Sequence, residues 1–238
     1  MHDEGIRTLP QSTPEFWGRA RAASLVAGPA LVLIPNLMGL NQVGTDASTL
    51  AWVRAHEGRY LLGVGILLAG FALLLPAGSR MATALSGRGA ALGRIGGALY
   101  FVGLVATLAT TSTYLLSARL ITLRAVDPAS ALVIKRVGDQ DGGVGVFLLV
   151  GVLFFAGAVL LVVGLLRGGL IPRWAGAISI VGVLGTMCAD IGGAQTPIVV
   201  LTLLVWWAGF AAIGAASLSW ETVGSPSSSG VTARVAGT

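Results

Sequence analysis

The stretch GVGVFLLVGVLFFAGAVLLVVGLL, from Gly143 to Leu166, decides the fold class of this chain. It runs for 24 residues without a charged or strongly polar side chain. About 20 such residues, wound as an α-helix, cross the hydrocarbon core of a bilayer. The stretch therefore predicts a membrane-spanning helix.

Further apolar stretches of similar length stand at 22–40, 59–77, 92–116, 171–189 and 197–218. Of the 238 residues, 55% are hydrophobic and only 11% are charged, whereas soluble domains average about 25% charged residues. We expect an all-α, polytopic membrane protein with six transmembrane helices within 18–218. A polar N-terminal segment, 1–17, should precede the helices, and a disordered tail, 219–238, should follow them.

The charges favour one orientation of the predicted bundle. The 15 basic residues are 14 arginines and Lys135, scattered beside apolar stretches without forming a run, so we expect no nucleic-acid partner. With the N-terminus inside, the inner segments hold nine basic residues and the outer loops six. Because cytoplasmic loops are the more positive, both termini are predicted to be cytoplasmic. The arginine- and alanine-rich composition is typical of a bacterial chain, which makes the cytoplasmic (inner) membrane the expected location.

A weak internal repeat underlies the apolar background. A shift of 80 residues lays Gly63-Val64-Gly65-Ile66-Leu67-Leu68 over Gly143-Val144-Gly145-Val146-Phe147-Leu148. A shift of 79 pairs Arg94 with Arg173, Gly103 with Gly182 and Thr107 with Thr186. The pattern predicts a duplicated central hairpin, in which spans two and three correspond to spans four and five. A pseudo-symmetry axis between such copies would lie along the membrane normal.

The third span also carries a stripe of small and polar residues at spacings of three and four: Gly89, Gly93, Gly96, Tyr100, Gly103, Thr107, Thr110, Tyr114 and Ser117. The fifth span repeats it as Ala175, Ser179, Gly182, Thr186 and Ala189. Small residues permit close approach of helices in lipid, so this stripe should face protein. We expect spans three and five at the bundle centre. A packing seam without any ligand is the simplest interpretation.

Polar residues gather at the outer ends of the predicted spans. The candidates for a binding site there are Asn36, His56, Glu57, Thr110, Tyr114 and Asp190. An ionisable group is costly to bury in a membrane and is a functional candidate for that reason. We predict an outward-facing ligand pocket with His56, Glu57 and Asp190 as its ionisable members. The alternative is that these groups meet water or lipid headgroups at the interface.

No pattern in the sequence points to catalysis or to a metal. His56 and Glu57 lack further ligands, because the only other histidine is His2, and Cys188 is the single cysteine. The chain has no His-Glu-x-x-His, Gly-x-Ser-x-Gly or P-loop motif. We therefore expect no metal and no cofactor, and an intramembrane enzyme ranks third among the possible functions.

The residues Ile171-Pro172-Arg173-Trp174-Ala175-Gly176 carry a family resemblance. This Pro-Arg-Trp opening of a helix after a short arginine loop, together with the six-span layout, resembles a broad group of uncharacterised six-span bacterial integral membrane proteins. The resemblance implies a fold and no catalytic residues.

Two functions fit the sequence best. The first is a non-enzymatic membrane protein that binds a lipid, another hydrophobic ligand or a membrane partner, including a second copy of itself, on its outer-leaflet side. The alternative is a small-molecule transporter with parallel hairpin repeats.

Overall fold

The computed structural model of the chain describes residues 14–38, 47–122, 144–191 and 196–221, with the isolated positions 127, 129–130 and 133. Within these ranges there is no strand. The long helices are α1 (Pro14–Leu37), α3 (Glu57–Ala84), α4 (Ala90–Thr122), α6 (Val144–Arg167), α7 (Arg173–Ile191) and α8 (Thr196–Ser217). The shorter elements are α2 (Ala47–Ala55) and the 3₁₀ turns η2 (Gly87–Gly89) and η4 (Leu218–Glu221). The predicted all-α fold is thus confirmed for the described residues.

Five of the long helices, α1, α3, α4, α6 and α8, are long and apolar enough to cross a membrane. The fifth predicted span, 171–189, is helical as α7, but its apolar part, Arg173–Ala189, is shorter than the other five. Most of the predicted N-terminal segment, 1–13, and most of the predicted tail, 222–238, lie outside the described residues.

Two helices extend past the ends of their apolar stretches. Helix α3 continues to Ala84 and α4 to Thr122, whereas the hydrophobic pattern predicted ends at 77 and 116. The hydroxyls of Ser79 and Thr83 donate to carbonyls of the preceding turn, Pro76 O at 2.8 Å and Ser79 O at 2.8 Å. These local bonds satisfy the hydroxyls without a break in the helix, so the end of the apolar stretch does not mark the end of the helix.

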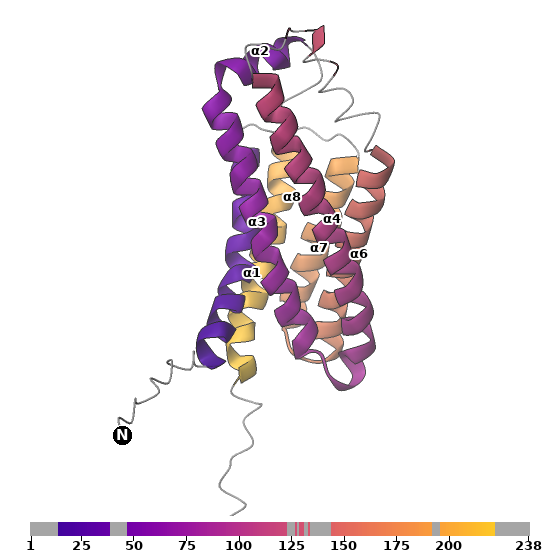
Figure 1. The fold of residues 1–238 in the computed structure, drawn as a ribbon. Helices are drawn as coiled ribbons and strands as arrows, with labels where there is room; N and C mark the ends of the chain where they lie inside the picture. Colours follow the sequence, from indigo (N-terminus) through magenta and orange to yellow (C-terminus); the bar gives the residue numbers. More distant parts are fainter. Residues whose placement is uncertain are drawn as a thin grey trace, which may run out of the picture.

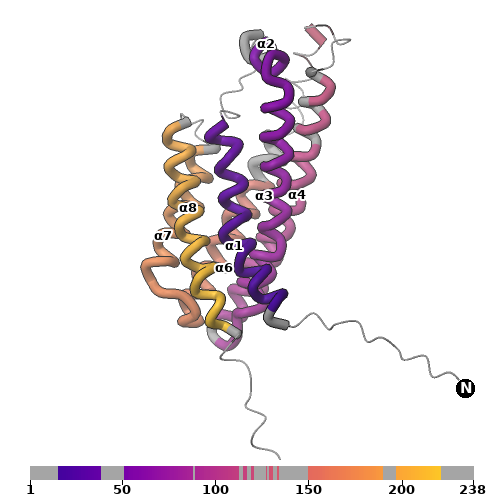
Figure 2. Tube along the Cα trace, turned by 90° about the vertical axis from the view of Figure 1, so that its left-hand side faces the viewer, coloured from indigo at the N-terminus to yellow at the C-terminus, as the bar shows by residue number. Residues whose placement is uncertain are grey.

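The long helices form a closed ring. Contacts run from α1 to α3, α4, α6, α7 and α8 in chain order, and α8 packs back onto α1. The chain enters α1 and leaves α8 at one end of the bundle, at the bottom of Figure 1, and α2 lies at the other end. Exposed arginines stand at or near the helix ends that meet at the lower end, which we call the basic end: Arg19 in α1, Arg94 in α4, Arg167 in α6 and Arg173 in α7. The opposite end is called the α2 end, and α3 and α4 reach further toward it than α1, α7 and α8 do (Figure 2).

Glycines bring together three successive helix pairs, α1–α3, α4–α6 and α7–α8. A methyl group on Gly28 would meet the Leu74 side chain of α3 at 2.8 Å. A methyl group on Gly103 would overlap the backbone of Phe154 in α6, and one on Gly182 would overlap the backbone of Trp206 in α8. The backbones of α4 and α6, and those of α7 and α8, therefore touch, whereas Gly28 of α1 receives a side chain of α3, and such close approach is expected for helices that associate in lipid.

The three contacting glycines share one position in their helices. Each stands nine residues after an exposed arginine at the basic end, in the pairs Arg19 and Gly28, Arg94 and Gly103, and Arg173 and Gly182. Each stands eight residues before a polar residue near the α2 end, namely Asn36, Thr111 and Asp190. The first helix of every pair thus has the same register between its arginine and its polar residue.

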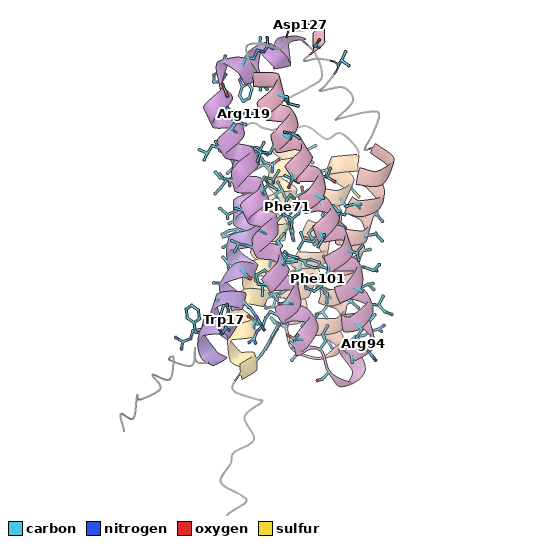
Figure 3. All side chains as sticks on the ribbon, in the orientation of Figure 1. Trp17, Phe71, Arg94, Phe101, Arg119 and Asp127 are labelled. Atoms are coloured by element: carbon cyan, nitrogen blue, oxygen red, sulfur yellow. The ribbon has the colours of Figure 1, made fainter. Side chains whose placement is uncertain are left out.

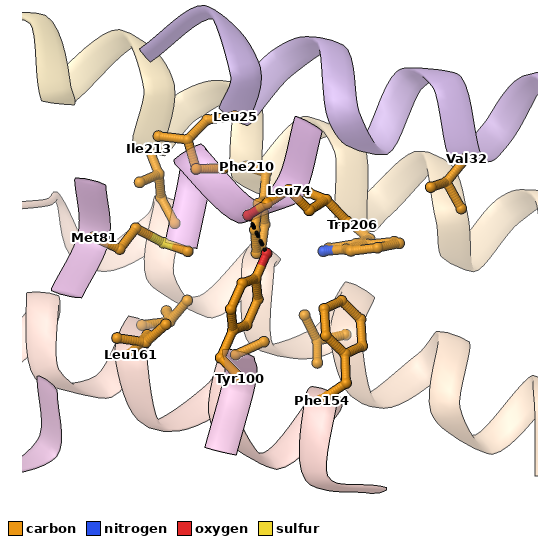
Figure 4. Close-up of a cluster of buried hydrophobic side chains, with 14 of the residues drawn as sticks. Leu25, Val32, Leu74, Met81, Tyr100, Phe154, Leu161, Trp206, Phe210 and Ile213 are labelled. Atoms are coloured by element: carbon orange, nitrogen blue, oxygen red, sulfur yellow. Dashed lines mark hydrogen bonds between the residues drawn. The ribbon is translucent and has the colours of Figure 1, made fainter. Parts of the chain in front are cut away.

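The centre of the bundle is filled by apolar and aromatic side chains (Figure 4). Tyr100 packs against Phe154 with ring centroids 5.1 Å apart, Phe154 against Trp206 at 6.1 Å, and Trp206 against Phe210 at 5.6 Å. These edge and tilted contacts link α4, α6 and α8 through one aromatic chain. Leu74, Met81, Leu161 and Ile213 are also fully buried in this cluster.

The predicted stripe on the third span is buried from Gly89 to Thr107, which confirms that it faces protein. The side chains of its last members, Tyr114 and Ser117, lie outside the described residues. The corresponding stripe on α7, from Ala175 to Ala189, is buried too.

The expected central position of these two spans is wrong. Val102 on α4 is 58% exposed and Val181 on α7 is 63% exposed, so each helix has an outward face. The reason is that each stripe faces its neighbours in the ring, α6 and α3 for α4 and α8 for α7, and the opposite face of each helix stays exposed.

Candidate functional site

The α2 end carries the polar groups that the sequence placed in a pocket. His56 forms the corner between α2 and α3, with φ −121° and ψ 34°. Its ring stacks on Trp52 with centroids 4.8 Å apart and an interplanar angle of 24°, and its Nδ1 lies 3.0 Å from the Trp52 carbonyl oxygen. Val53, on the other side of α2, is almost fully buried and anchors this short helix on the bundle.

Glu57 starts α3 and forms an ion pair with Arg119 in α4. Glu57 Oε1 accepts a hydrogen bond from Arg119 Nη1 at 2.7 Å. A carboxylate in the first turn of a helix and a cation in the last turn of another both suit the helix dipoles. The two side chains are 40% and 62% exposed, so the pair is open to solvent or to lipid headgroups.

Asn36 and Thr110 are engaged with their own helices. Asn36 is buried near the end of α1, and its Nδ2 donates to the Val32 carbonyl at 2.8 Å. Thr110 donates to the Ala106 carbonyl at 2.9 Å, and Thr111 donates to Thr107 in the same way. Hydrogen bonds of this local kind satisfy a polar side chain inside a membrane without a ligand.

Two of the predicted pocket residues are brought together in the described part of the chain. His56 and Glu57 lie together at the α2–α3 corner, whereas Asn36 lies on α1, which packs on α3 and α8, and Thr110 lies on α4, which packs on α3 and α6. Tyr114 and Asp190 belong to α4 and α7, but their side chains lie outside the described residues.

Sequence reasoning missed Arg119 as the partner of Glu57. A usable signal existed, because α3 and α4 are joined by a short turn at residues 85–89 and run antiparallel. Counting outward from Gly87 puts Glu57 30 residues before the turn and Arg119 32 residues after it. Residues at nearly equal distances from a hairpin turn lie side by side.

A second polar cluster, also missed, closes the basic end. Arg80 Nη2 donates to the Ser217 carbonyl at 3.0 Å, and the guanidinium carbon lies 5.6 Å from the centre of the Trp220 ring. Trp220 Nε1 donates in turn to the Leu170 carbonyl at 3.0 Å. This cluster joins α3, the end of α8 and the connection between α6 and α7.

Outside the bundle, Asp127 accepts the backbone N–H groups of Ala129 and Ser130 at 3.0 Å each. Hydrogen bonds from the Ser130 hydroxyl and from these N–H groups hold the pKa of Asp127 below its usual range. Figure 3 shows Asp127 at the α2 end, beyond Arg119.

Within the described ranges, no three His, Cys, Asp or Glu side chains come together in a way that could hold a metal ion. In the comparisons with known proteins, no family model, no curated protein and no solved structure matches this chain.

Proposed function

We propose that this chain is a six-span protein of a bacterial cytoplasmic membrane that binds a lipid or another membrane-embedded molecule at its α2 end, without chemical turnover. In this proposal the basic end faces the cytoplasm and the α2 end faces the outer leaflet. The observation that carries it is the exposed Glu57–Arg119 pair beside the Trp52–His56 stack, on the two helices that extend furthest. Charged groups beside a flat aromatic surface suit a lipid headgroup and its first methylene groups.

The depth of this site supports the assignment to lipid. The 23 residues from Glu57 to Arg80 on α3 span about 35 Å at about 1.5 Å per residue. The hydrocarbon core of a bilayer is about 30 Å thick. With Arg80 at the cytoplasmic interface, Glu57 and Arg119 stand at the level of the outer headgroups.

The exposed arginines support the orientation. Arg19, Arg94, Arg167 and Arg173 are exposed at the basic end, and positive residues favour the cytoplasmic side. The exposed Trp17 and Trp174 stand beside these arginines in the sequence, as interfacial aromatic residues do.

The common register of the helix pairs supports the proposal that α7 is a sixth membrane span. Arg19 and Asn36, Arg94 and Thr111, and Arg173 and Asp190 are each separated by 17 residues. If α1 and α4 cross the bilayer with this register, then α7 crosses it too. The predicted duplication matches α3–α4 with α6–α7. The shared register keeps the match of α4 with α7 and adds α1 to it, which groups the spans instead as three tandem pairs, α1–α3, α4–α6 and α7–α8.

The test is native mass spectrometry of the full chain, extracted in mild detergent from its own membrane. We expect the wild-type protein to retain a lipid or another small molecule at fixed stoichiometry. The variant Arg119→Gln should lose this molecule, and Arg94→Gln, an exposed arginine on the same helix at the basic end, should retain it. Equal retention by all three proteins would contradict the binding position, and a bare chain from all three would contradict stable binding.

A small-molecule transporter is the second candidate, because repeated helix pairs related along the membrane normal are a feature of several transporter folds. Against it, the centre of the bundle is packed with side chains such as Leu74, Leu161 and Phe210. Substrate flux into proteoliposomes that is lost in Asp190→Asn or Asn36→Ala would favour transport over stable binding.

A further inference from the structure

The centre of the bundle contains a hydrogen-bond donor that the fold does not satisfy. The Trp206 side chain is 1% exposed, and its indole Nε1 has no hydrogen-bond partner in the part of the chain that the structure describes. The next tryptophan in the chain, Trp207, donates to the Val26 carbonyl at 3.2 Å, and Trp220 donates to the Leu170 carbonyl. Trp206 therefore differs from its two neighbours in α8 and η4.

The depth of Trp206 keeps its N–H away from water at either interface. It stands 10 residues from Thr196 and 14 residues from Trp220, or about 15 Å and about 21 Å along the helix at about 1.5 Å per residue. An indole can reach interfacial water over only a few ångströms. An unsatisfied donor at such a depth is costly, because the hydrocarbon offers no acceptor.

The ring of Trp206 is held in place by its surroundings. The backbone of the residue touches Gly182, and the ring packs edge-on against Phe154 and Phe210, with interplanar angles of 75° and 80°. In Figure 4 the nitrogen lies on the side of the ring that faces the Tyr100 hydroxyl. Rotation of the indole toward another partner would break both aromatic contacts.

Tyr100 supplies the second polar group. Its side chain is fully buried, and its hydroxyl donates to the Leu74 carbonyl at 3.0 Å. A hydroxyl that donates its single hydrogen still has acceptor lone pairs. The Tyr100 oxygen can therefore accept a hydrogen bond from a molecule that itself accepts one from Trp206.

Packing alone does not require an indole at position 206. The residue that meets the contacting glycine is Leu74 in the first helix pair and Phe154 in the second, and both are buried and apolar. Only the third pair places a nitrogen at this point. The glycine contact of the other two helix pairs forms without any N–H group, so the N–H of Trp206 is not needed for this packing.

We infer that Trp206 Nε1 and Tyr100 Oη form a binding site at the bundle centre for one small acceptor oxygen. The oxygen accepts the indole N–H and, when it carries a hydrogen, donates to Tyr100 Oη. A single water molecule has this chemistry, and so does the hydroxyl of a small molecule that copurifies with the protein. Bound water typically makes two to four such hydrogen bonds.

The first test uses NMR of the detergent-solubilised full chain with ¹⁵N-labelled indoles. The Trp206 signal is assigned by its loss in Trp206→Phe. We expect a downfield, hydrogen-bonded indole proton with a cross-peak to water, which identifies water, or to a copurified molecule, which identifies that source instead. In Tyr100→Phe this signal should move. An upfield indole proton with neither cross-peak would overturn the inference.

The second test keeps the shape of the side chain. Replacement of Trp206 by 3-benzothienylalanine substitutes sulfur for the N–H group without leaving a large cavity. We expect the Tm to fall by about 2–4 °C, the shift expected when one hydrogen bond is lost from a chain of this size. The same replacement at Trp207, whose acceptor is known, is the matched control and should lower the Tm. If the Tm instead rises for Trp206 and falls for Trp207, the Trp206 N–H has no partner and the inference is wrong.

Discussion

Glu57 and Arg119 stand 62 residues apart in the sequence, yet Glu57 Oε1 lies 2.7 Å from Arg119 Nη1. The first belongs to the opening turn of α3 and the second to the last turn of α4, so their ion pair joins two neighbouring helices at the α2 end. Because both side chains are open to solvent, the ion pair adds little to the stability of the fold. Its position beside Trp52 and His56 suits a binding surface better than a stabilising role.

The ion pair can be measured by charge reversal. Glu57→Arg or Arg119→Glu alone should each destabilise the protein by up to about 1 kcal/mol, since exposed pairs contribute about that much at most. The double variant Glu57→Arg/Arg119→Glu should recover most of the loss. Thermal unfolding in detergent at low salt measures all three, and a double variant that shows the simple sum of the two losses would mean that the residues do not interact.

Close packing of the helix pairs predicts a strong effect of one methyl group. Gly103→Ala should lower the free energy of unfolding by about 1–3 kcal/mol, because the new Cβ overlaps the backbone of Phe154. Gly65→Ala in α3 is the matched control, since a Cβ there meets nothing within 4 Å. The control should be neutral or gain up to about 1 kcal/mol from helix propensity. Similar losses in both variants would argue against a backbone contact at Gly103.

Removal of Arg80 should loosen the basic end. Arg80→Ala takes away the hydrogen bond to the Ser217 carbonyl and the contact with Trp220, with an expected loss of about 1–3 kcal/mol. Arg80→Lys should recover only part of it, because an ammonium lacks the flat guanidinium face. Arg94→Ala, at an exposed position, should change stability by less than about 0.5 kcal/mol. Thermal unfolding of the three variants measures these losses.

Asp127 provides a prediction about pH. A carboxyl whose folded pKa is lowered stabilises its turn above the ordinary pKa of aspartate, and that stabilisation is lost as the pH falls through the folded pKa. The turn that contains Ala129 and Ser130 should therefore stay capped at a pH where a free aspartate is already half protonated, and it should open in stronger acid. Carbon-13 NMR of the Asp127 carboxyl should show titration below that of a free aspartate. Ser130→Ala should move the titration back toward the ordinary value.

The orientation is tested by single cysteines in a Cys188→Ser background. Arg119→Cys should react with a membrane-impermeant maleimide on intact cells. Arg167→Cys, at the end of α6, should react only after the membrane is permeabilised. The reverse pattern would place the basic end outside, and labelling of both in intact cells would contradict the six-span arrangement.

The apolar stretches predicted the existence of every long helix, because a run of about 20 apolar residues has few alternatives in a protein. They did not predict where α3 and α4 end. Beyond the last apolar residue the helix is continued by groups such as Ser79 and Thr83, whose hydroxyls bond to the helix itself. Hydropathy does not detect such bonds.

The candidate site was less predictable than the fold. Asn36 and Thr110 carry groups that can either meet a ligand or bond to a carbonyl four residues back, and the sequence does not distinguish these choices. In the structure both take the local bond. The cluster of Arg80, Trp220 and Leu170 joins three distant segments, and its formation depends on how the ring of helices closes.

The pairing of helices by glycine bears on how the chain is made. Each of the three pairs begins and ends at the basic end, so a pair can leave the translocation machinery as one unit whose arginines at the basic end stay on the side of synthesis. The turns between pairs contain Gly87 and Gly169, both with positive φ, which lets the chain reverse at once and start the next hairpin. We expect synthesis to add the pairs one after another, each finding its own closest partner before the ring closes through α1 and α8.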